Sequence, residues 1–341
     1  MKKKTATISI AITIAILLFT IAGTYLLFLN KPFRVTSPTF IYIDEDDSAD
    51  SVFAKIETRL QPESMTGLKL LSRIKGYDKS IFTGAYRINP QMTTLEVFRI
   101  LKAGRQTPVR LVVPSVRTMD KLASRIAGQI MADSLSIITL LNDSNYIASI
   151  GYNKATIPAL FIPNTYEVYW NMNAEAFIKR MIRENNAFWN TERTEKAKSL
   201  NMTKEEICTL ASIVDEETAN NAEKPLVAGL YINRLNRGML LQADPTVKFS
   251  LQDFGIRRIL FKHLETDSPY NTYKYAGPPP GPIRIPSVAG INSVLNYSKH
   301  NFIYMCAKED FSGTHNFAST LSEHNRNARK YQMALNRRNI K

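Results

Sequence analysis

The chain has few of the residues that build disulfide frameworks and thiol redox sites. Its 341 residues contain only two cysteines, Cys208 and Cys306, and no C-x-x-C pair. A disulfide-stapled fold and a dithiol redox centre are therefore not expected. Cys208 lies among apolar residues of a predicted helix, and we interpret it as a buried thiol rather than one half of a disulfide.

Histidine is equally scarce and does not form a metal-binding pattern. The four histidines are scattered and form no H-E-x-x-H spacing: His263, His300, His315 and His324. We therefore expect no metal and no cofactor. His315 and His324 could line a site, but we interpret them as loop-capping residues. Ser212 lies outside any G-x-S-x-G context, so a serine hydrolase is not expected.

Charge is absent from residues 5–30, which follow three N-terminal lysines. A membrane-spanning helix needs roughly 20 apolar residues, whereas the apolar part of a cleavable signal is shorter, at about 7–15 residues. The apolar run continues to Leu29, and no cysteine follows to suggest a lipoprotein. We predict a retained single-pass anchor in the cell (inner) membrane, with a cleaved signal peptide as the alternative. The lysines should stay in the cytoplasm, so the chain after Asn30 should lie on the periplasmic or extracytoplasmic side.

The exported part is strongly basic. The whole chain carries a formal charge of +14, and removing the three N-terminal lysines leaves +11 because residues 1–30 contain no acid. Such a charge beside a membrane suits anionic lipid headgroups or an acidic polymer. Nucleic acid is not expected as a partner because the domain is exported.

Short strands and helices alternate over residues 39–113, which predicts a compact α+β module. We expect helices at 48–60, 68–76 and 92–104 and strands at 83–88 and 108–113. The third helix should begin at Thr93 and end at Gly104.

The rest of the chain is expected to be mixed, with helices dominant before Gly238. Residues 118–200 should be mostly helical, interrupted by a structured loop at 157–170, and residues 203–238 should form two helices. After Gly238 the composition predicts loops around LLQADPTV, SPYNTYKYAGPPPGPIRIPS and THNF. We predict an α+β fold in three parts, namely an anchor at 1–30, a membrane-proximal module at 31–113 and a larger domain at 114–341.

An acidic triplet ends the first of the two helices in 203–238. At about 100° per residue, Glu217 falls between Leu210 and Ile213 on the apolar face. Asp215 falls just outside that face, and Glu216 falls opposite it, toward solvent. A carboxyl group on an apolar face loses hydration, so its pKa rises and it can serve as a general acid.

The alternative for Glu217 is a buried carboxylate that pairs with an arginine, either Arg234 or Arg237. Polar and aromatic residues on the segments that follow favour chemistry on a sugar, because tyrosine rings stack on pyranose faces and amides bond hydroxyls. Our candidates for substrate binding are Asn233, Gln242, Asp244, Thr246, Tyr270, Asn271, Thr272 and Tyr273. Helix-end and turn bonding remains an alternative for Asn233 and Asp244.

Several motifs occur together in one order: LASIVDEETA, VAGLYINRL, GMLLQADPTV, YNTY, GPPPGPIRIP and THNFASTLSEHN. In order and spacing they resemble the endolytic murein transglycosylases, the MltG or YceG-like family. GAYRINPQMTTLEVFRILKAG resembles the LysM-like module of that family. The resemblance covers residues 30–330 and implies a transmembrane helix, a small LysM-like α+β module and a mixed α/β catalytic domain with a helical segment that bears the glutamate.

The resemblance also implies an activity. The family cleaves glycosidic bonds inside peptidoglycan glycan strands and leaves 1,6-anhydro-N-acetylmuramic ends. Its catalytic glutamate is the second acid of an E-x-E-T pattern, which corresponds here to Glu217. The first acid is Asp215 instead of Glu, which leaves the role of that position open. Peptidoglycan, membrane lipid and the cell-wall synthesis machinery are the partners implied.

Two other functions remain open at this point. One is a lysozyme-type muramidase, which would use Glu217 as the acid and Asp244 as the second carboxylate. The other is a non-catalytic scaffold that binds the cell wall. A lytic transglycosylase needs only Glu217, which first protonates the bridging oxygen and then takes the proton of the muramic 6-hydroxyl.

Overall fold

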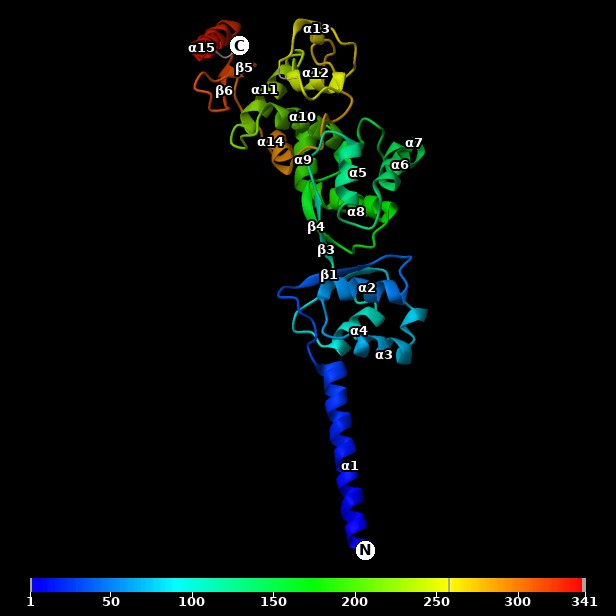
Figure 1. Cartoon of the computed structure of the whole chain (residues 1–341). Helices are drawn as coiled ribbons and strands as arrows, with labels where there is room; N and C mark the ends of the chain where they lie inside the picture. Colours follow the sequence, from blue (N-terminus) through cyan, green and yellow to red (C-terminus); the bar gives the residue numbers. More distant parts are fainter. Residues whose placement is uncertain (1, 257, 339–341) are drawn as a thin grey trace. The chain divides into compact units, whose positions relative to one another are not determined.

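The computed structural model of the chain describes residues 2–256 and 258–338. The chain forms two compact units. The first comprises Met1–Leu111 with Gln129–Met131 and Glu167–Asn173, and the second comprises Val112–Gly128, Ala132–Tyr166 and Ala174–Lys341. Helices and strands occur in both units (Figure 1), which confirms the predicted α+β class.

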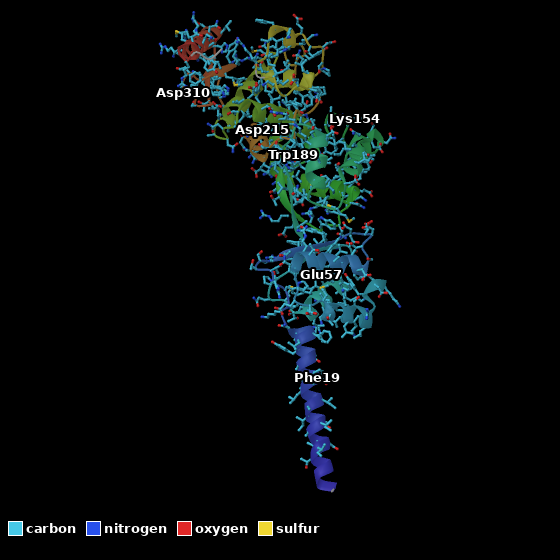
Figure 2. The ribbon with its side chains drawn as sticks, in the orientation of Figure 1. Phe19, Glu57, Lys154, Trp189, Asp215 and Asp310 are labelled. Carbon is cyan, nitrogen blue, oxygen red and sulfur yellow. The ribbon has the colours of Figure 1, made fainter. Side chains whose placement is uncertain are left out.

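The first unit begins with a long apolar helix. α1 spans Lys2–Thr24 and continues into a π-helical turn, η1, at Tyr25–Leu29. The 24 residues of Ala6–Leu29 have a mean hydropathy of 2.4, and their length and composition suit a membrane span or a signal sequence. Phe19 projects from the bare helix (Figure 2) and is 81% exposed. An apolar helix of spanning length is thus confirmed, whereas its retention as an anchor stays a prediction.

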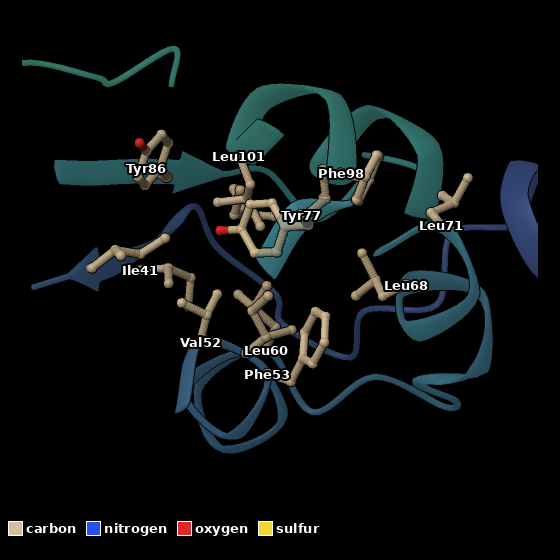
Figure 3. Packing of buried hydrophobic residues seen from close by; sticks show 14 of the residues in the cluster. Ile41, Val52, Phe53, Leu60, Leu68, Leu71, Tyr77, Tyr86, Phe98 and Leu101 are labelled. Carbon is tan, nitrogen blue, oxygen red and sulfur yellow. The ribbon is translucent and has the colours of Figure 1, made fainter. Parts of the chain in front are cut away.

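A small α+β module completes the first unit. Its elements are β1 (Thr39–Ile43), α2 (Ala49–Leu60), α3 (Thr66–Lys75), the 3-10 turn η2 (Tyr77–Lys79), β2 (Gly84–Ile88) and α4 (Thr94–Lys102). β1 and β2 pair antiparallel, with Ile41 opposite Tyr86. Leu60, Leu68 and Phe98 pack with both of these residues into one apolar core (Figure 3). The helices and strand predicted for this module are confirmed, while its likeness to LysM stays a prediction.

The turn η1 is fastened to the starts of α3 and α4. Phe28 packs against the core of the module. A Cβ placed on Gly67 would come within 2.0 Å of the Leu27 carbonyl oxygen, so only glycine allows the first turn of α3 to lie this close to η1. At the start of α4, the Thr94 amide donates to the Asn30 carbonyl oxygen over 3.4 Å. The apolar helix therefore ends directly against α3 and α4.

Two further short sheets follow the small module along the chain. β3 (Val109–Val113) pairs with β4 (Asn164–Val168), and β5 (Tyr304–Ala307) pairs antiparallel with β6 (His315–Ala318). The helices before the acidic triplet are α5 (Met119–Ala127), α6 (Ser134–Asn142), α7 (Ser144–Ser149), the 3-10 turn η3 (Ile157–Leu160), α8 (Ala174–Phe188) and α9 (Thr191–Ser199). From the triplet onward they are α10 (Lys204–Glu217), α11 (Lys224–Asn236), α12 (Asp244–Leu251), α13 (Phe261–Leu264), α14 (Val288–Leu295) and α15 (Leu321–Arg337).

α10 is the buried centre of the second unit. The Thr203 hydroxyl accepts from the Glu206 amide and the Glu206 carboxylate accepts from the Thr203 amide, which is a complete capping box. Every residue from Ile207 to Val214 is buried, and α10 packs against α11, α12 and α14. Ser212 accepts a bond of 3.0 Å from the Ile283 amide, so this serine holds a loop in place. Cys208 is a buried free thiol, as predicted.

The prediction that the chain is loop-rich after Gly238 is wrong in two of the three segments it named. Residues 244–251 form helix α12, because Pro245 lies in the first turn, where a missing amide hydrogen costs nothing. The THNF segment is strand β6, which pairs with β5, a short strand that the composition did not predict. Residues 164–168, expected within a structured loop, form strand β4.

Candidate active site

A cavity of about 330 Å³ opens beside the end of α10. Glu217 is the last residue of that helix, and Thr218 leaves helical geometry with an extended backbone. Fifteen residues line the cavity: Glu217, Leu230, Tyr231, Arg234, Leu241, Gln242, Asp244, Tyr273, Ile303, Tyr304, Met305, Cys306, Ala307, His315 and His324. Two carboxyl groups, those of Glu217 and Asp244, therefore lie on a wall that also supplies tyrosines and apolar side chains.

The surroundings of Glu217 favour its protonated form. Burial raises the pKa of Glu217 to about 7, and the negative charge of Asp244 adds to the rise. The Tyr231 hydroxyl donates to Glu217 Oε1 over 2.6 Å, and this bond and the nearby His315 act in the opposite direction. The predicted pairing with Arg234 or Arg237 is wrong, because the partner of this carboxyl group is a tyrosine on α11.

Arg234 has other partners on the cavity wall. Its guanidinium donates to the carbonyl oxygens of Leu240 and Ile303 and to the side-chain oxygen of Gln242. These contacts fix the Gln242 side chain, whose backbone has φ of +53°. Arg234 is 6% exposed, and its hydrogen bonds connect α11 to Ile303, the residue directly before β5.

Asp244 and Tyr273 form a second polar pair in the cavity. The Tyr273 hydroxyl donates to Asp244 Oδ1 over 2.6 Å. Burial, together with the adjacent carboxylate of Asp244, raises the pKa of Tyr273 far above its usual range, so the hydroxyl keeps its proton. Asp244 is thus held by a hydrogen bond on the same wall as Glu217.

Comparison with known proteins shows the family of the chain. The family described as YceG-like matches residues 41–330, which is most of the chain. The chain belongs to the YceG-like family.

Two curated relatives of the YceG-like chain share a name. An endolytic murein transglycosylase of Bacillus subtilis (strain 168) is 29% identical over 269 residues, which cover 74% of this chain and 74% of that protein. An endolytic murein transglycosylase of Streptococcus pneumoniae (strain D39) is 27% identical over 283 residues, which cover 73% of this chain and 50% of that protein. The YceG-like chain thus spans about half of its pneumococcal relative.

A solved structure supports the fold alone. The crystal structure of a YceG-like protein of Listeria monocytogenes matches with a TM-score of 0.58 at 24% identity, and it covers 86% of this chain and 99% of that one. The predicted family is confirmed by these findings.

The structure brings together only part of the predicted sugar-binding set of the YceG-like chain. Gln242, Asp244 and Tyr273 line the cavity with Glu217. The other five predicted residues do not line it: Asn233, Thr246, Tyr270, Asn271 and Thr272. Sugar binding by these five stays a prediction.

Those five side chains have partners within the fold. Asn233 donates to the carbonyl oxygens of His300 and Phe302. Thr246 and Thr272 share a buried hydroxyl contact of 2.8 Å, and Asn271 donates to the backbone of a neighbouring turn. Tyr270 packs on Phe249 with ring centroids 4.7 Å apart. Asn233 thus fixes the segment before β5, while the contacts of the other four fix the segments that carry Asp244 and Tyr273.

Two of the four histidines lie at the cavity. His315 and His324 line the cavity, so the interpretation of both as loop caps is wrong. Glu223, which is 6% exposed, accepts from the His315 amide over 2.7 Å and lies 3.0 Å from its Nδ1. His324 stacks on Tyr304, and burial lowers the pKa of its ring. Both histidines come from the segment after residue 303, nearly a hundred residues beyond Glu217.

Glu216 was predicted to face solvent, and this is wrong. Its side chain is 11% exposed and accepts two bonds of 2.7 Å from Arg117. Arg284 adds a third at 3.0 Å. The side of α10 to which Glu216 points was predicted correctly, but the segments that carry Arg117 and Arg284 cover that side.

Asp215 is a structural anchor. Its side chain is 3% exposed and forms an ion pair of 2.6 Å with Lys224, which is 8% exposed. The Ser287 amide and hydroxyl donate to the same carboxylate over 2.6 and 2.8 Å. A Cβ on Gly290 would come within 2.7 Å of this carboxylate. Asp215 therefore joins α10 to α11 and to the start of α14, away from the cavity lining.

Among residues 2–256 and 258–338, no group of three or more His, Cys, Asp or Glu side chains is placed to hold a metal ion. The sequence reasoning missed Tyr231, the direct partner of Glu217. A tyrosine inside the apolar run LVAGLYI was the available signal, because a buried tyrosine needs a partner for its hydroxyl.

Proposed function

We propose that this protein is an endolytic lytic transglycosylase of peptidoglycan. It would cleave the bond between N-acetylmuramic acid and N-acetylglucosamine inside glycan strands and leave 1,6-anhydro ends. Membership of the YceG-like family and the names of the relatives support the substrate and the reaction. The observation that carries the proposal is Glu217, a carboxyl group with a pKa raised to about 7 on the wall of a cavity.

The proposed reaction uses Glu217 twice. The protonated carboxyl group first gives its proton to the bridging oxygen, and the bond from this oxygen to the muramic anomeric carbon breaks. The muramic 6-hydroxyl oxygen then bonds to that anomeric carbon, and its proton passes to the Glu217 carboxylate. The enzyme regains its starting state, and no water is consumed.

Tyr231 would position this acid. Its hydroxyl holds Glu217 Oε1 at 2.6 Å, which fixes one oxygen and leaves Oε2 for the substrate. The bond also stabilises the carboxylate formed after the first proton transfer, as a donor to a charged acceptor does. Gln242, Asp244 and Tyr273 are the proposed sugar-binding residues with support from their place on the cavity wall.

We place the protein at the cell membrane. Residues 1–30 would form a retained anchor, residues 31–113 a membrane-proximal LysM-like module, and residues 114–341 the catalytic domain on the extracytoplasmic side. The apolar segment Ala6–Leu29 supports the anchor by its length and composition. Contact with the cell-wall synthesis machinery stays a prediction from the family resemblance.

A muramidase is the second candidate, because one observation favours it. Asp244 lies close enough to Glu217 for its charge to raise the pKa of the glutamate. A hydrolase needs such a second carboxylate to activate water or to attack the sugar. Here, however, the Tyr273 hydroxyl already occupies one oxygen of Asp244.

Product analysis tests the proposal. Wild-type protein and the Glu217→Gln variant are incubated with purified glycan strands, and the products are weighed by mass spectrometry. We expect products one water lighter than hydrolytic ones from the wild type and a loss of about 10²-fold or more in the variant. Glu195→Gln, a change at an exposed glutamate of α9, is the matched control. Reducing ends would establish a muramidase, and a wild type that binds strands without cutting them would establish a scaffold.

A further inference from the structure

One face of the small module in the first unit is apolar and basic at once. On α3, Gly67, Leu68, Leu71 and Ser72 face the core. The opposite face presents Leu70 and Ile74, which are 39% and 65% exposed and lie one turn apart. Exposed side chains of this size on neighbouring turns form a continuous apolar ridge.

Basic side chains surround this ridge. Residues 66–79 and 94–106 contain seven lysines and arginines but only two acids, which gives a net charge of +5. We use the name α3–α4 surface for the ridge and these bases: Lys69, Leu70, Arg73, Ile74, Lys75, Lys79, Arg99, Lys102 and Arg105. Between the two helices lies a groove of about 450 Å³, with Leu71, Leu95 and Phe98 among its lining residues. The α3–α4 surface therefore combines apolar side chains with lysines and arginines around one groove.

The α3–α4 surface begins where the apolar segment ends. The close approach of Gly67 to Leu27 and the bond from Thr94 to Asn30 fasten the first turns of α3 and α4 to η1. Ile74 follows Gly67 by seven residues, which is about 10 Å along the helix. The headgroup layer on each side of a bilayer is about 5–8 Å thick, so Ile74 lies at or near this layer.

We propose that the α3–α4 surface binds the anionic lipid headgroups of the membrane that holds the apolar segment. Leu70 and Ile74 would enter the boundary between headgroups and acyl chains, while the exposed bases contact lipid phosphates. Lys102 instead donates to the Gly76 carbonyl oxygen and the Ser80 hydroxyl within the module. This inference rests on the proposed membrane anchor. It assigns to the module a task beside glycan cleavage, which is to hold the module against the bilayer.

The mixture of residues favours lipid over an acidic polymer in the cell wall. A hydrated polyanion would pair with the lysines and arginines but would gain nothing from Leu70 and Ile74. A bilayer interface rewards both kinds of side chain, because apolar groups leave water while cations meet an anionic surface.

Lipid quenching in vesicles tests the proposal on the full chain. Ile74→Cys carries an environment-sensitive fluorophore, Cys306→Ser removes the half-buried thiol, and the buried Cys208 is left in place. The protein is reconstituted into phosphatidylcholine vesicles with or without phosphatidylglycerol, and both contain a headgroup quencher. We expect at least threefold stronger quenching in the anionic vesicles, and a fall of this difference in high salt.

Charge reversal provides the matched comparison. Arg73→Glu, Arg99→Glu and Arg105→Glu together should abolish the difference between the two vesicles. Three reversals at exposed arginines on α2, β2 and β3 should preserve it: Arg59→Glu, Arg87→Glu and Arg110→Glu. Equal quenching in both vesicles, or equal loss in both triple variants, would overturn the proposal. A probe that responds to added glycan strands but not to lipid would identify a cell-wall polymer as the occupant instead.

Failure of the anchor or of the enzyme would look different. Alkaline carbonate extracts the chain from vesicles only if the apolar segment does not span them. Cleavage of soluble glycan strands should be unchanged by the three reversals on the α3–α4 surface, because these residues lie outside the cavity lining. Each proposal can thus fail without the other.

Discussion

The Asp244→Asn variant separates the two candidate reactions. Asp244 is one of the charges that raise the pKa of Glu217. In the structure the Tyr273 hydroxyl donates to Asp244 Oδ1 over 2.6 Å. Asparagine keeps an oxygen that can accept this bond but removes the negative charge. Without that charge the ionised form of Glu217 is less disfavoured, so the pKa of Glu217 falls.

The size of the effect follows from the protonated fraction. With a pKa of about 7, about half of the Glu217 side chains carry a proton at pH 7. An ordinary glutamate with a pKa of 4.5 would be protonated in only about 0.3% of molecules at this pH. If the variant moves the pKa down by about one pH unit, the fraction at pH 7 falls to about one tenth. The cleavage rate should therefore fall about fivefold at pH 7 and stay nearly unchanged at pH 5.

The assay is the initial rate of anhydro-end formation between pH 5 and pH 9. We expect the alkaline limb of the profile of Asp244→Asn to lie at lower pH than that of the wild type. Asp253→Asn, at an exposed aspartate just after α12, is the control and should leave the profile in place. A loss of about 10³-fold at every pH would mark Asp244 as an essential second carboxylate and refute the single-acid reasoning. A limb displaced to higher pH would refute the electrostatic argument.

Two further changes test the contacts of the acidic residues at the end of α10. Tyr231→Phe removes a donor that stabilises ionised Glu217, so the pKa of Glu217 should rise and the alkaline limb of the pH–rate profile should move to higher pH. Asp215→Asn leaves the buried ammonium of Lys224 without its counter-charge and should lower the free energy of unfolding by about 3–5 kcal/mol in urea titrations. Lys198→Met, which breaks an exposed pair, should change it by less than about 1 kcal/mol, and equal losses in the two variants would contradict the structural role of Asp215.

Local signals were sufficient for much of the helical framework. The capping boxes at Thr93 and Thr203 each use a glutamate three residues later, and the helix start predicted at Thr93 is confirmed. Helical phasing correctly separated Glu217 from its neighbours, because the phase of a regular helix follows from spacing alone. The YceG-like family was predicted from motif order and is confirmed by the family match.

The part of the cavity wall formed by β5, β6 and α15 could not be predicted from local sequence patterns. Tyr304, His315 and His324 reach the site through the β5–β6 pair and α15, which lie nearly a hundred residues after Glu217. The pairing of two four-residue strands leaves little trace in a local pattern. The interpretation of THNF as a loop and of its histidine as a cap failed for the same reason.

The acidic triplet shows that helix geometry alone does not predict the role of each acid. Phasing gives the direction of each side chain but not what the rest of the chain brings to that side. Lys224 and Ser287 donate hydrogen bonds to the Asp215 carboxylate and thereby tie α10 to neighbouring segments. Arg117 and Arg284 donate to the Glu216 carboxylate in the same way. Both acids receive cationic partners. Only the third acid contacts a neutral tyrosine instead of a cation. Burial, with the added charge of Asp244, raises the pKa of Glu217 to about 7, so Glu217 has a proton to give at neutral pH.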